Sequence, residues 1–129
     1  MKLETIQTDK RGSINLLLDD LKTLEEVTIF ITKSGYARGG CIHELHDEHC
    51  CVIEGEVAYY IGQGGYCCTI LEMGDSIIIP KNTPHLFTSL TDSVVLEWGA
   101  IPAEKQCKHV EFRAIVDKIN KEKDNDSSV

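Results

Sequence analysis

The sequence predicts an all-β fold, a barrel or sandwich of short strands, followed by one helix near the carboxyl end. Three observations predict it. Runs rich in β-branched and aromatic residues recur along the chain, as in residues 27–32. Clusters of glycine, asparagine and proline separate these runs, as in residues 81–84. After residue 110 the apolar residues change to the spacing of a helix.

The strands can be placed in chain order. Residues 3–24 form an opening segment in which Arg11, Gly12 and Ser13 indicate a turn before an apolar run. The pattern then predicts strands over 27–32, 40–45, 50–61, 66–71, 76–79, 85–89 and 94–99. Glycine, asparagine and proline predict turns over 62–65, 72–75 and 81–84. Short strands with turns this frequent favour a closed or double-layered sheet.

The last part of the chain follows a different pattern. The helical spacing is carried by Phe112, Ile115, Val116 and Ile119. It predicts one amphipathic helix, packed on the outside of the barrel or on a partner subunit. Residues 121–129 are charged and polar, which predicts a disordered tail. Because no repeat, linker or second hydrophobic unit is visible, residues 1–120 are predicted to form a single domain.

Length and composition limit the function classes. The chain of 129 residues suits one domain with one core. Its net charge of −8 argues against non-specific binding to nucleic acid or a membrane surface, because phosphates would be repelled. The polar N-terminus and the lack of a long apolar stretch predict a cytoplasmic protein without a signal peptide. The adjacent cysteine pairs at 50–51 and 67–68 then read as small apolar fillers rather than disulfides.

Two short residue patterns contain side chains that can bind a metal or take part in catalysis. The first, over residues 35–55, contains Gly35, Cys41, His43, Glu48 and Gly55. The second, over residues 74–89, contains Gly74, Pro80 and His85. Side chains two apart on a strand point to the same face, so Cys41 and His43 can reach one point inside a barrel. Glu48 can start a returning strand after a bend, and His85 can arrive from a third strand.

These residues predict a metal site. Cys41, His43, Glu48 and His85 form a mixed sulfur, nitrogen and oxygen set suited to a divalent transition metal. Zinc or iron fits this set best, and nickel, cobalt or manganese is compatible with it. The Cys41 thiol can bind as a thiolate, or it can stay out and leave a three-ligand site with open positions.

Two other interpretations of these residues stay open. A cysteine and a histidine two apart are, on their own, more often ordinary strand residues than ligands. A compact zinc cluster of Cys41, His43, His46 and Cys50 also fits the spacing. The alternating pattern over 48–61 disfavours that cluster, because it places these groups along a barrel wall.

The two patterns, in this order and spacing, resemble the two motifs of the cupin superfamily over residues 27–99. The resemblance implies a cupin double-stranded β-helix (jelly-roll) barrel that holds a metal through three histidines and a glutamate. Here Cys41 stands where most metal-binding cupins have the first histidine, and Ser89 stands where the second motif often ends in asparagine. Small cupins usually pair their barrels, which implies a homodimer; the outward positions Cys51 and Ile53 and the C-terminal helix are candidate contacts.

A narrower resemblance concerns residues 9–13, 27–30 and 38–43, which look like the arrangement in cupins that act on nucleotide-linked sugars, the 3,4-ketoisomerases. It implies proton abstraction beside a ketone, an enediol intermediate and reprotonation at the neighbouring carbon. His43 would supply a base with a pKa near neutrality, and Arg38 or Arg11 would bind the diphosphate. Those isomerases generally work without the metal that this ligand set implies.

Three function classes follow. The preferred one is a metal-dependent enzyme that isomerises or epimerises a small polar, sugar-like metabolite. Its predicted catalytic residues are His43 and Glu48, and its predicted substrate-binding residues are Arg38, Tyr59 and Phe87. The second class is a non-haem iron dioxygenase with the same ligands. The third is a non-catalytic cupin that binds a small ligand or a metal.

Overall fold

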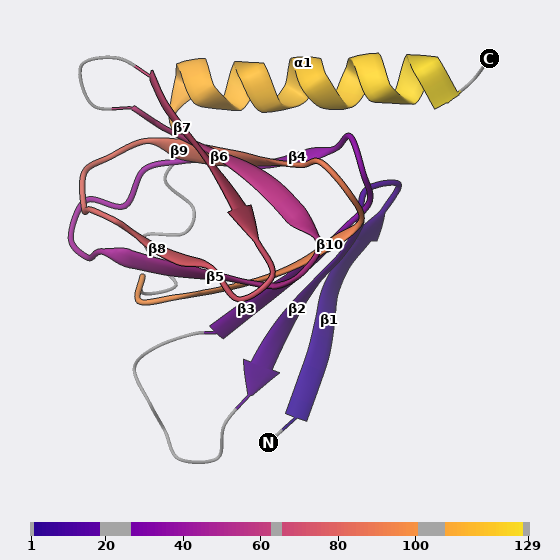
Figure 1. Cartoon of the computed structure of the whole chain (residues 1–129). Coiled ribbons are helices and arrows are strands. Elements are labelled where there is room, and N and C mark those ends of the chain that lie inside the picture. Colours follow the sequence, from indigo (N-terminus) through magenta and orange to yellow (C-terminus); the bar gives the residue numbers. More distant parts are fainter. Residues whose placement is uncertain (1, 19–26, 63–65, 101–107, 128–129) are drawn as a thin grey trace.

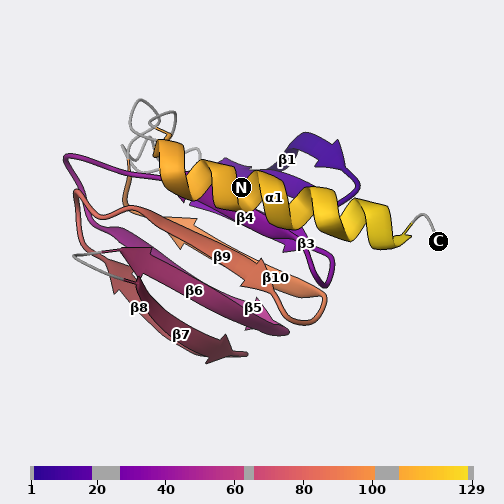
Figure 2. The same cartoon turned by 90° about the horizontal axis from the view of Figure 1, so that it is seen from above.

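Two antiparallel sheets and one helix make up the computed structural model, which describes residues 2–18, 27–62, 66–100 and 108–127 (Figure 1). One sheet has six strands and the other has four. The helix lies across the outer side of the smaller sheet (Figure 2). The predicted all-β jelly roll with a C-terminal helix is therefore confirmed. No helix within these described ranges is long and apolar enough to cross a membrane.

The strand bounds give the topology. The six-stranded sheet has the order β1-β2-β3-β10-β5-β8, formed by β1 (Lys2–Asp9), β2 (Gly12–Leu18), β3 (Val27–Thr32), β10 (Ser93–Trp98), β5 (Glu48–Glu54) and β8 (Ser76–Ile79). The four-stranded sheet has the order β4-β9-β6-β7, formed by β4 (Ala37–Cys41), β9 (His85–Ser89), β6 (Glu56–Gly62) and β7 (Tyr66–Glu72). Three strands, β3, β8 and β9, have the bounds that the sequence predicts. The turn predicted over 62–65 falls mostly outside the described residues.

One predicted strand, over 50–61, is wrong. The chain turns at Gly55, which has a φ of 84°, and β5 and β6 on either side of it belong to different sheets. A Cβ atom at Gly55 would collide with the carbonyl oxygen of Asp92, so the turn needs a residue without a side chain. The apolar pattern runs on through this turn because both strands bury residues in the same core.

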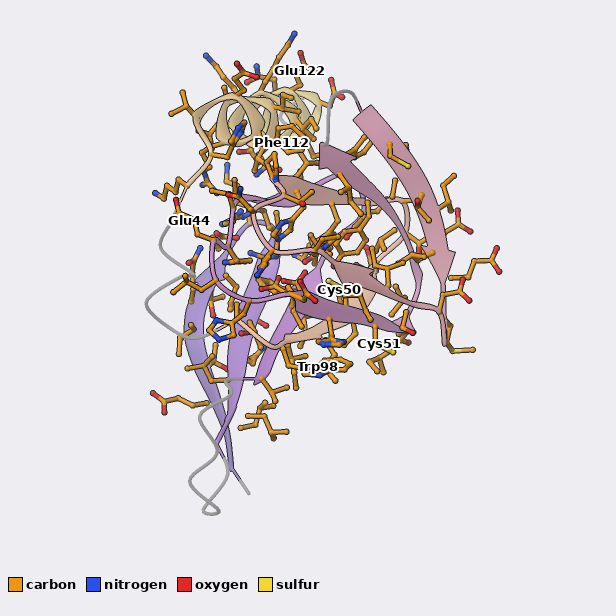
Figure 3. The ribbon with its side chains drawn as sticks, turned by 90° about the vertical axis from the view of Figure 1, so that its left-hand side faces the viewer. Glu44, Cys50, Cys51, Trp98, Phe112 and Glu122 are labelled. Atoms are coloured by element: carbon orange, nitrogen blue, oxygen red, sulfur yellow. The ribbon has the colours of Figure 1, made fainter. Side chains whose placement is uncertain are left out.

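That core lies between the two sheets and contains Cys50, Val52, Val57, Tyr59, Leu71, Ile79, Phe87 and Val95. Side chains alternate along β5, as its pleat requires. Cys50 is buried in the core, whereas its neighbour Cys51 is partly exposed on the outer side near Trp98 (Figure 3). Both cysteines are free, as expected of apolar fillers.

The helix α1 (Val110–Ser127) packs on β4 and β9. Phe112 and Val116 are buried against Ala37 and Leu86, which confirms the predicted apolar stripe. The predicted disordered tail is wrong for residues 121–127, because the helix continues through them. Polar contacts hold this part: the Tyr36 hydroxyl donates to Asp124 Oδ1 at 2.7 Å. A charged composition therefore did not distinguish an exposed helical end from disorder.

Candidate metal centre

Three buried side chains meet at one point inside the barrel. One ligand atom each from His43, Glu48 and His85 lies within 4.8 Å of the other two. The two carboxylate oxygens of Glu48 face different rings: Oε2 is 2.9 Å from His43 Nε2, and Oε1 is 3.5 Å from His85 Nε2. The three side chains are at most 5% exposed, so bulk water competes little for their ligand atoms.

Each of the three comes from a different part of the chain. Glu48 is the first residue of β5, His85 is the first residue of β9, and His43 lies between β4 and β5. The Nδ1 atom of His85 lies 3.2 Å from the carbonyl oxygen of Thr83. A carbonyl only accepts hydrogen bonds, so Nδ1 is protonated and donates to it, while Nε2 faces the Glu48 carboxylate. A histidine that binds a metal through Nε2 requires this arrangement, with the proton of Nδ1 held by a carbonyl and Nε2 directed at the site.

The Glu48 carboxyl is ionised. Burial by itself opposes its ionisation, but hydrogen bonds involving Glu97, His43 and His85 outweigh burial and lower the pKa of Glu48 well below its usual range. A buried carboxylate between two imidazoles is a donor set that divalent transition metals prefer. The residues therefore fit a metal of this kind.

Glu97, on β10, is a residue of this site that the sequence reasoning missed. Glu97 is 7% exposed, and its ligand atom forms a second close group with those of Glu48 and Cys50. The Tyr59 hydroxyl donates to Glu97 Oε2 at 2.6 Å. A signal was present: Glu97 lies two residues after the buried Val95, so alternation places its carboxyl on the inner face.

Cys41 does not join the three-residue cluster. The strand β4 ends at Cys41, and its pairing with β9 shifts between Gly39 and Cys41, so Cys41 and His43 do not share one regular strand as predicted. The thiol lies in the wall of the same pocket. Burial, followed by the charges of Glu97 and Glu48, raises the pKa of Cys41 to about 11, which disfavours the thiolate. Ligation by Cys41 remains a prediction.

The alternative zinc cluster is not formed among the residues that the structure describes. Of its four members, His46 is exposed and Cys50 groups with Glu48 and Glu97 instead. His49 faces outward, where its ring stacks on Trp98 with a centroid separation of 5.3 Å.

A pocket of about 460 Å³ opens over the cluster. Its wall includes His43, Glu48 and His85, and it also includes Arg38 and Phe87. This volume suits a small metabolite. Of the predicted substrate-binding residues, Arg38 and Phe87 line the pocket. Tyr59, which is fully buried in the core, is not among the lining residues and reaches the pocket only through Glu97.

Comparisons with known proteins agree with this architecture. A family model described as the cupin domain matches residues 33–101. No curated protein matches the chain. One similar solved structure is the capsular polysaccharide assembling protein CapF from Staphylococcus aureus, with 19% identity, a TM-score of 0.70, and coverage of 84% of this chain and 32% of that chain. The chain thus spans about a third of the length of the CapF chains.

Two further structures share the fold. KdgF from Halomonas sp. is 19% identical with a TM-score of 0.63, and the match covers 76% of this chain and 86% of that chain. Oxalate decarboxylase from Bacillus subtilis, described for its Mn(II) centres, is 16% identical with a TM-score of 0.67, over 77% of this chain and 27% of that chain. At these identities the matches establish the fold alone.

Proposed function

The chain belongs to the cupin domain family, and from this premise we propose that it is a metal-dependent enzyme that isomerises or epimerises a small polar, sugar-like metabolite through an enediol-type intermediate. The observation that carries the proposal is the cluster of His43, Glu48 and His85 in the wall of a pocket of metabolite size. A structural core has no need for two imidazoles facing a buried carboxylate.

In this proposal His43, Glu48 and His85 hold a divalent transition metal, with zinc or iron preferred. When bound, such a metal acts as a Lewis acid that polarises a carbonyl or hydroxyl oxygen of the substrate. Three protein ligands leave coordination positions open for substrate oxygens. The buried setting excludes water from the reacting atoms, which strengthens each charge interaction there.

The roles of His43 as ligand and as base exclude each other. One lone pair on Nε2 either binds a metal or accepts a proton. In the metal-dependent reaction His43 is therefore a ligand. The carboxylate of Glu97, in the wall of the same pocket, then takes the proton from the carbon beside the carbonyl and returns it to the neighbouring carbon. The predicted role of His43 as base belongs to the metal-free alternative, the ketoisomerase-like reaction. In the wall of the pocket, Arg38 offers the substrate a polar contact and Phe87 offers it an apolar one.

The names of two structural relatives support this proposal. CapF is described as assembling capsular polysaccharide, which favours a sugar-like substrate. The oxalate decarboxylase is described for its Mn(II) centres, which favours a divalent metal in this fold. Both proteins are much longer than this chain, so their whole activities are not carried over.

Deuterium exchange tests the proposed reaction. The protein, loaded with zinc, manganese or ferrous iron, is incubated in D₂O with a panel of aldoses, ketoses and sugar acids. Enediol chemistry replaces the hydrogen beside the carbonyl by deuterium, and proton NMR follows the loss of its signal. We expect exchange that falls at least about 100-fold in Glu48→Gln and stays unchanged in Glu44→Gln, which alters an exposed carboxylate nearby. Equal exchange in the wild type and Glu48→Gln would contradict the proposal.

The position of Cys41 favours a second candidate function, a non-haem iron dioxygenase. With Cys41 outside the cluster, two histidines and one carboxylate remain, a set typical of ferrous oxygenases. The same substrate panel, with iron-loaded protein in an oxygen electrode, separates the two functions. Oxygen consumption without deuterium exchange indicates the dioxygenase, and saturable binding without either indicates a non-catalytic cupin.

A further inference from the structure

Arg38 is a buried cation with incomplete hydrogen bonding. Arg38 is only 2% exposed, and it lies on β4 in the wall of the pocket. Its Nε atom donates to Thr32 Oγ1 at 2.7 Å, and Nη2 donates to the carbonyl oxygens of Ile31 at 3.2 Å and Ser13 at 3.5 Å. The buried Nη1 atom has no hydrogen-bond partner among the described residues. All the acceptors that Arg38 does have are neutral.

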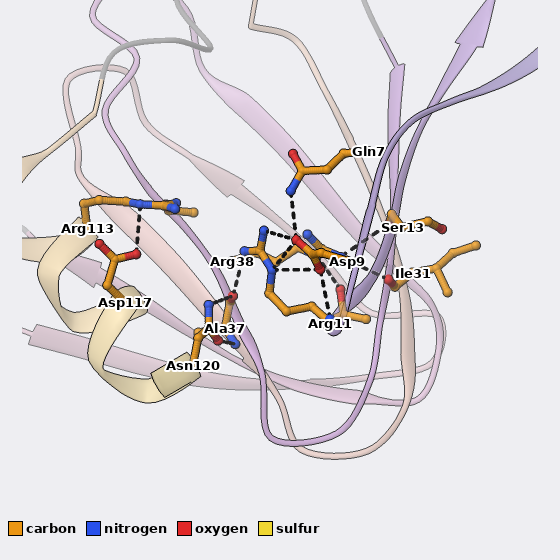
Figure 4. Close-up of polar contacts among 12 residues, drawn as sticks. Gln7, Asp9, Arg11, Ser13, Ile31, Ala37, Arg38, Arg113, Asp117 and Asn120 are labelled. Carbon is orange, nitrogen blue, oxygen red and sulfur yellow. Dashed lines mark hydrogen bonds and ion pairs between the residues drawn. The ribbon is translucent and has the colours of Figure 1, made fainter. Parts of the chain in front are cut away.

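Arg38 has no ion-pair partner of its own among the described residues. The neighbouring Arg11 forms an ion pair with Asp9, with Nη2 of the arginine 2.7 Å from Oδ2 of the carboxylate (Figure 4). The carboxylates of Asp9 and Glu97 both act on Arg38 through their charge, but no described carboxylate forms an ion pair with it. Burial, followed by the charge of Arg11, lowers the pKa of Arg38 to about 10. At neutral pH the Arg38 side chain therefore still carries its charge.

This arrangement indicates a missing anion. A buried charged donor that lacks an acceptor is costly, and the Nη1 atom of Arg38 is such a donor. Native structures retain such groups mainly where a ligand, an ion or a water satisfies them. The ring of Phe30, whose centroid lies 5.6 Å from Arg38 Cζ, makes one side of the guanidinium apolar, and this strengthens its attraction for an anion.

We propose that Arg38 binds a carboxylate of the substrate, so that the substrate is a sugar acid or a related hydroxy acid. The inference rests on the proposed function for taking this pocket as the substrate site, since Arg38 and the cluster of His43, Glu48 and His85 line the same pocket. The substrate's carboxylate lies at Arg38 and its reacting oxygen lies at the cluster. A single available guanidinium nitrogen matches a monoanion better than a phosphate dianion, which usually needs several cationic or backbone donors.

The covered position of Nη1 has a consequence for binding. Because bulk water does not reach this atom, a carboxylate can reach it only after a side chain shifts.

Acetate is the probe for this site, with acetamide as its neutral isostere. Thermal unfolding of the metal-free full chain is followed at constant ionic strength while either compound is titrated. We expect acetate to raise the Tm saturably, by about 5 °C at ten times its Kd, and acetamide to have no effect. The stabilisation is lost in Arg38→Met and kept in Lys121→Met, which removes a charge from an exposed position on α1.

Three results would overturn the inference: equal stabilisation by acetamide, acetate stabilisation that persists in Arg38→Met, or stabilisation by inorganic phosphate that exceeds that by acetate. If Arg38→Met does not fold, nitrogen NMR of the arginine side chains in the wild type decides. We then expect the chemical shifts of the Arg38 guanidinium nitrogens to change on addition of acetate and not on addition of acetamide. If acetate does not change them, the inference is overturned.

Repeating the titration on zinc-loaded protein separates this inference from the proposed function. Acetate stabilisation that depends on Arg38, in a protein that binds no metal, contradicts the metal-dependent function and supports the carboxylate site. Stoichiometric metal binding without any effect of acetate supports the metal-dependent function and contradicts the carboxylate site.

Discussion

Glu48 links the two histidines of the site, and its ionisation gives the fold a dependence on pH. The pKa of Glu48 is lowered in the folded state, so its contribution to stability is complete above the unfolded value near 4.5 and is lost as the pH falls below that value. We expect the free energy of unfolding of metal-free protein, from urea titrations, to fall as the pH is lowered from about 5 to about 3. The fall should be smaller in Glu48→Gln and unchanged in Glu44→Gln. If the free energy of unfolding of Glu48→Gln depended on pH as that of the wild type does, the Glu48 carboxylate would not be held ionised by the fold.

Cys41 differs from the exposed cysteines in its chemistry. Because the pKa of Cys41 is raised to about 11, only ~0.1% of this thiol is ionised at pH 8. We expect iodoacetamide at pH 8 to modify Cys67, which is exposed, much faster than Cys41 in metal-free protein. Peptide mass spectrometry over a time course measures both rates. Equal rates would mean that the Cys41 thiol is more accessible or more acidic than the structure implies.

At the scale of elements, the turn between β5 and β6 directs the chain from one sheet to the other. Gly55 and Gly74 both have positive φ, 84° and 90°, but only Gly55 lacks space for a side chain, while a Cβ at Gly74 meets nothing within 4 Å. Gly74→Ala should therefore cost about 1 kcal/mol from backbone strain alone. Gly55→Ala should cost more, because the methyl group also meets the Asp92 carbonyl. Urea denaturation of both variants measures the difference, and equal costs would contradict the close approach.

At the scale of the whole molecule, the outer face of the six-stranded sheet carries an apolar patch over β3, β10 and β5. Cross-strand pairing places Ile29, Leu96 and Cys51 in one row and brings Ile31 beside Val94. The side chains of Ile31 and Ile53 on this face are 42% and 49% exposed, in keeping with the outward position predicted for Cys51 and Ile53. An apolar sheet face of this kind is suited to contact with a second copy of the chain.

We therefore expect a homodimer through this face. Sedimentation velocity should show a dimer for the wild type and a monomer for Ile53→Lys. Ile70→Lys, which alters an even more exposed isoleucine on β7 of the other sheet, should remain dimeric. A wild type that sediments as a monomer at micromolar concentrations would contradict the prediction.

The sequence predicted the architecture better than the details of the site. Strand periodicity, turn residues and the stripe through Phe112 and Val116 are local signals, and they were sufficient for the β fold and the start of α1. The strand break at Gly55 and the irregular end of β4 at Cys41 depend on contacts between distant segments, which periodicity does not report. Glu97 was missed for a related reason, since its importance comes from Glu48 and Tyr59, which belong to other strands.

The central claim, a divalent metal held by His43, Glu48 and His85, is tested most directly by elemental mass spectrometry. The protein is purified without an affinity metal and compared with His43→Ala, Glu48→Ala, His85→Ala and Cys41→Ser. We predict near-stoichiometric metal in the wild type and in Cys41→Ser, and a loss of metal in the other three variants. A wild type that contains no metal and takes none up on titration would contradict the account.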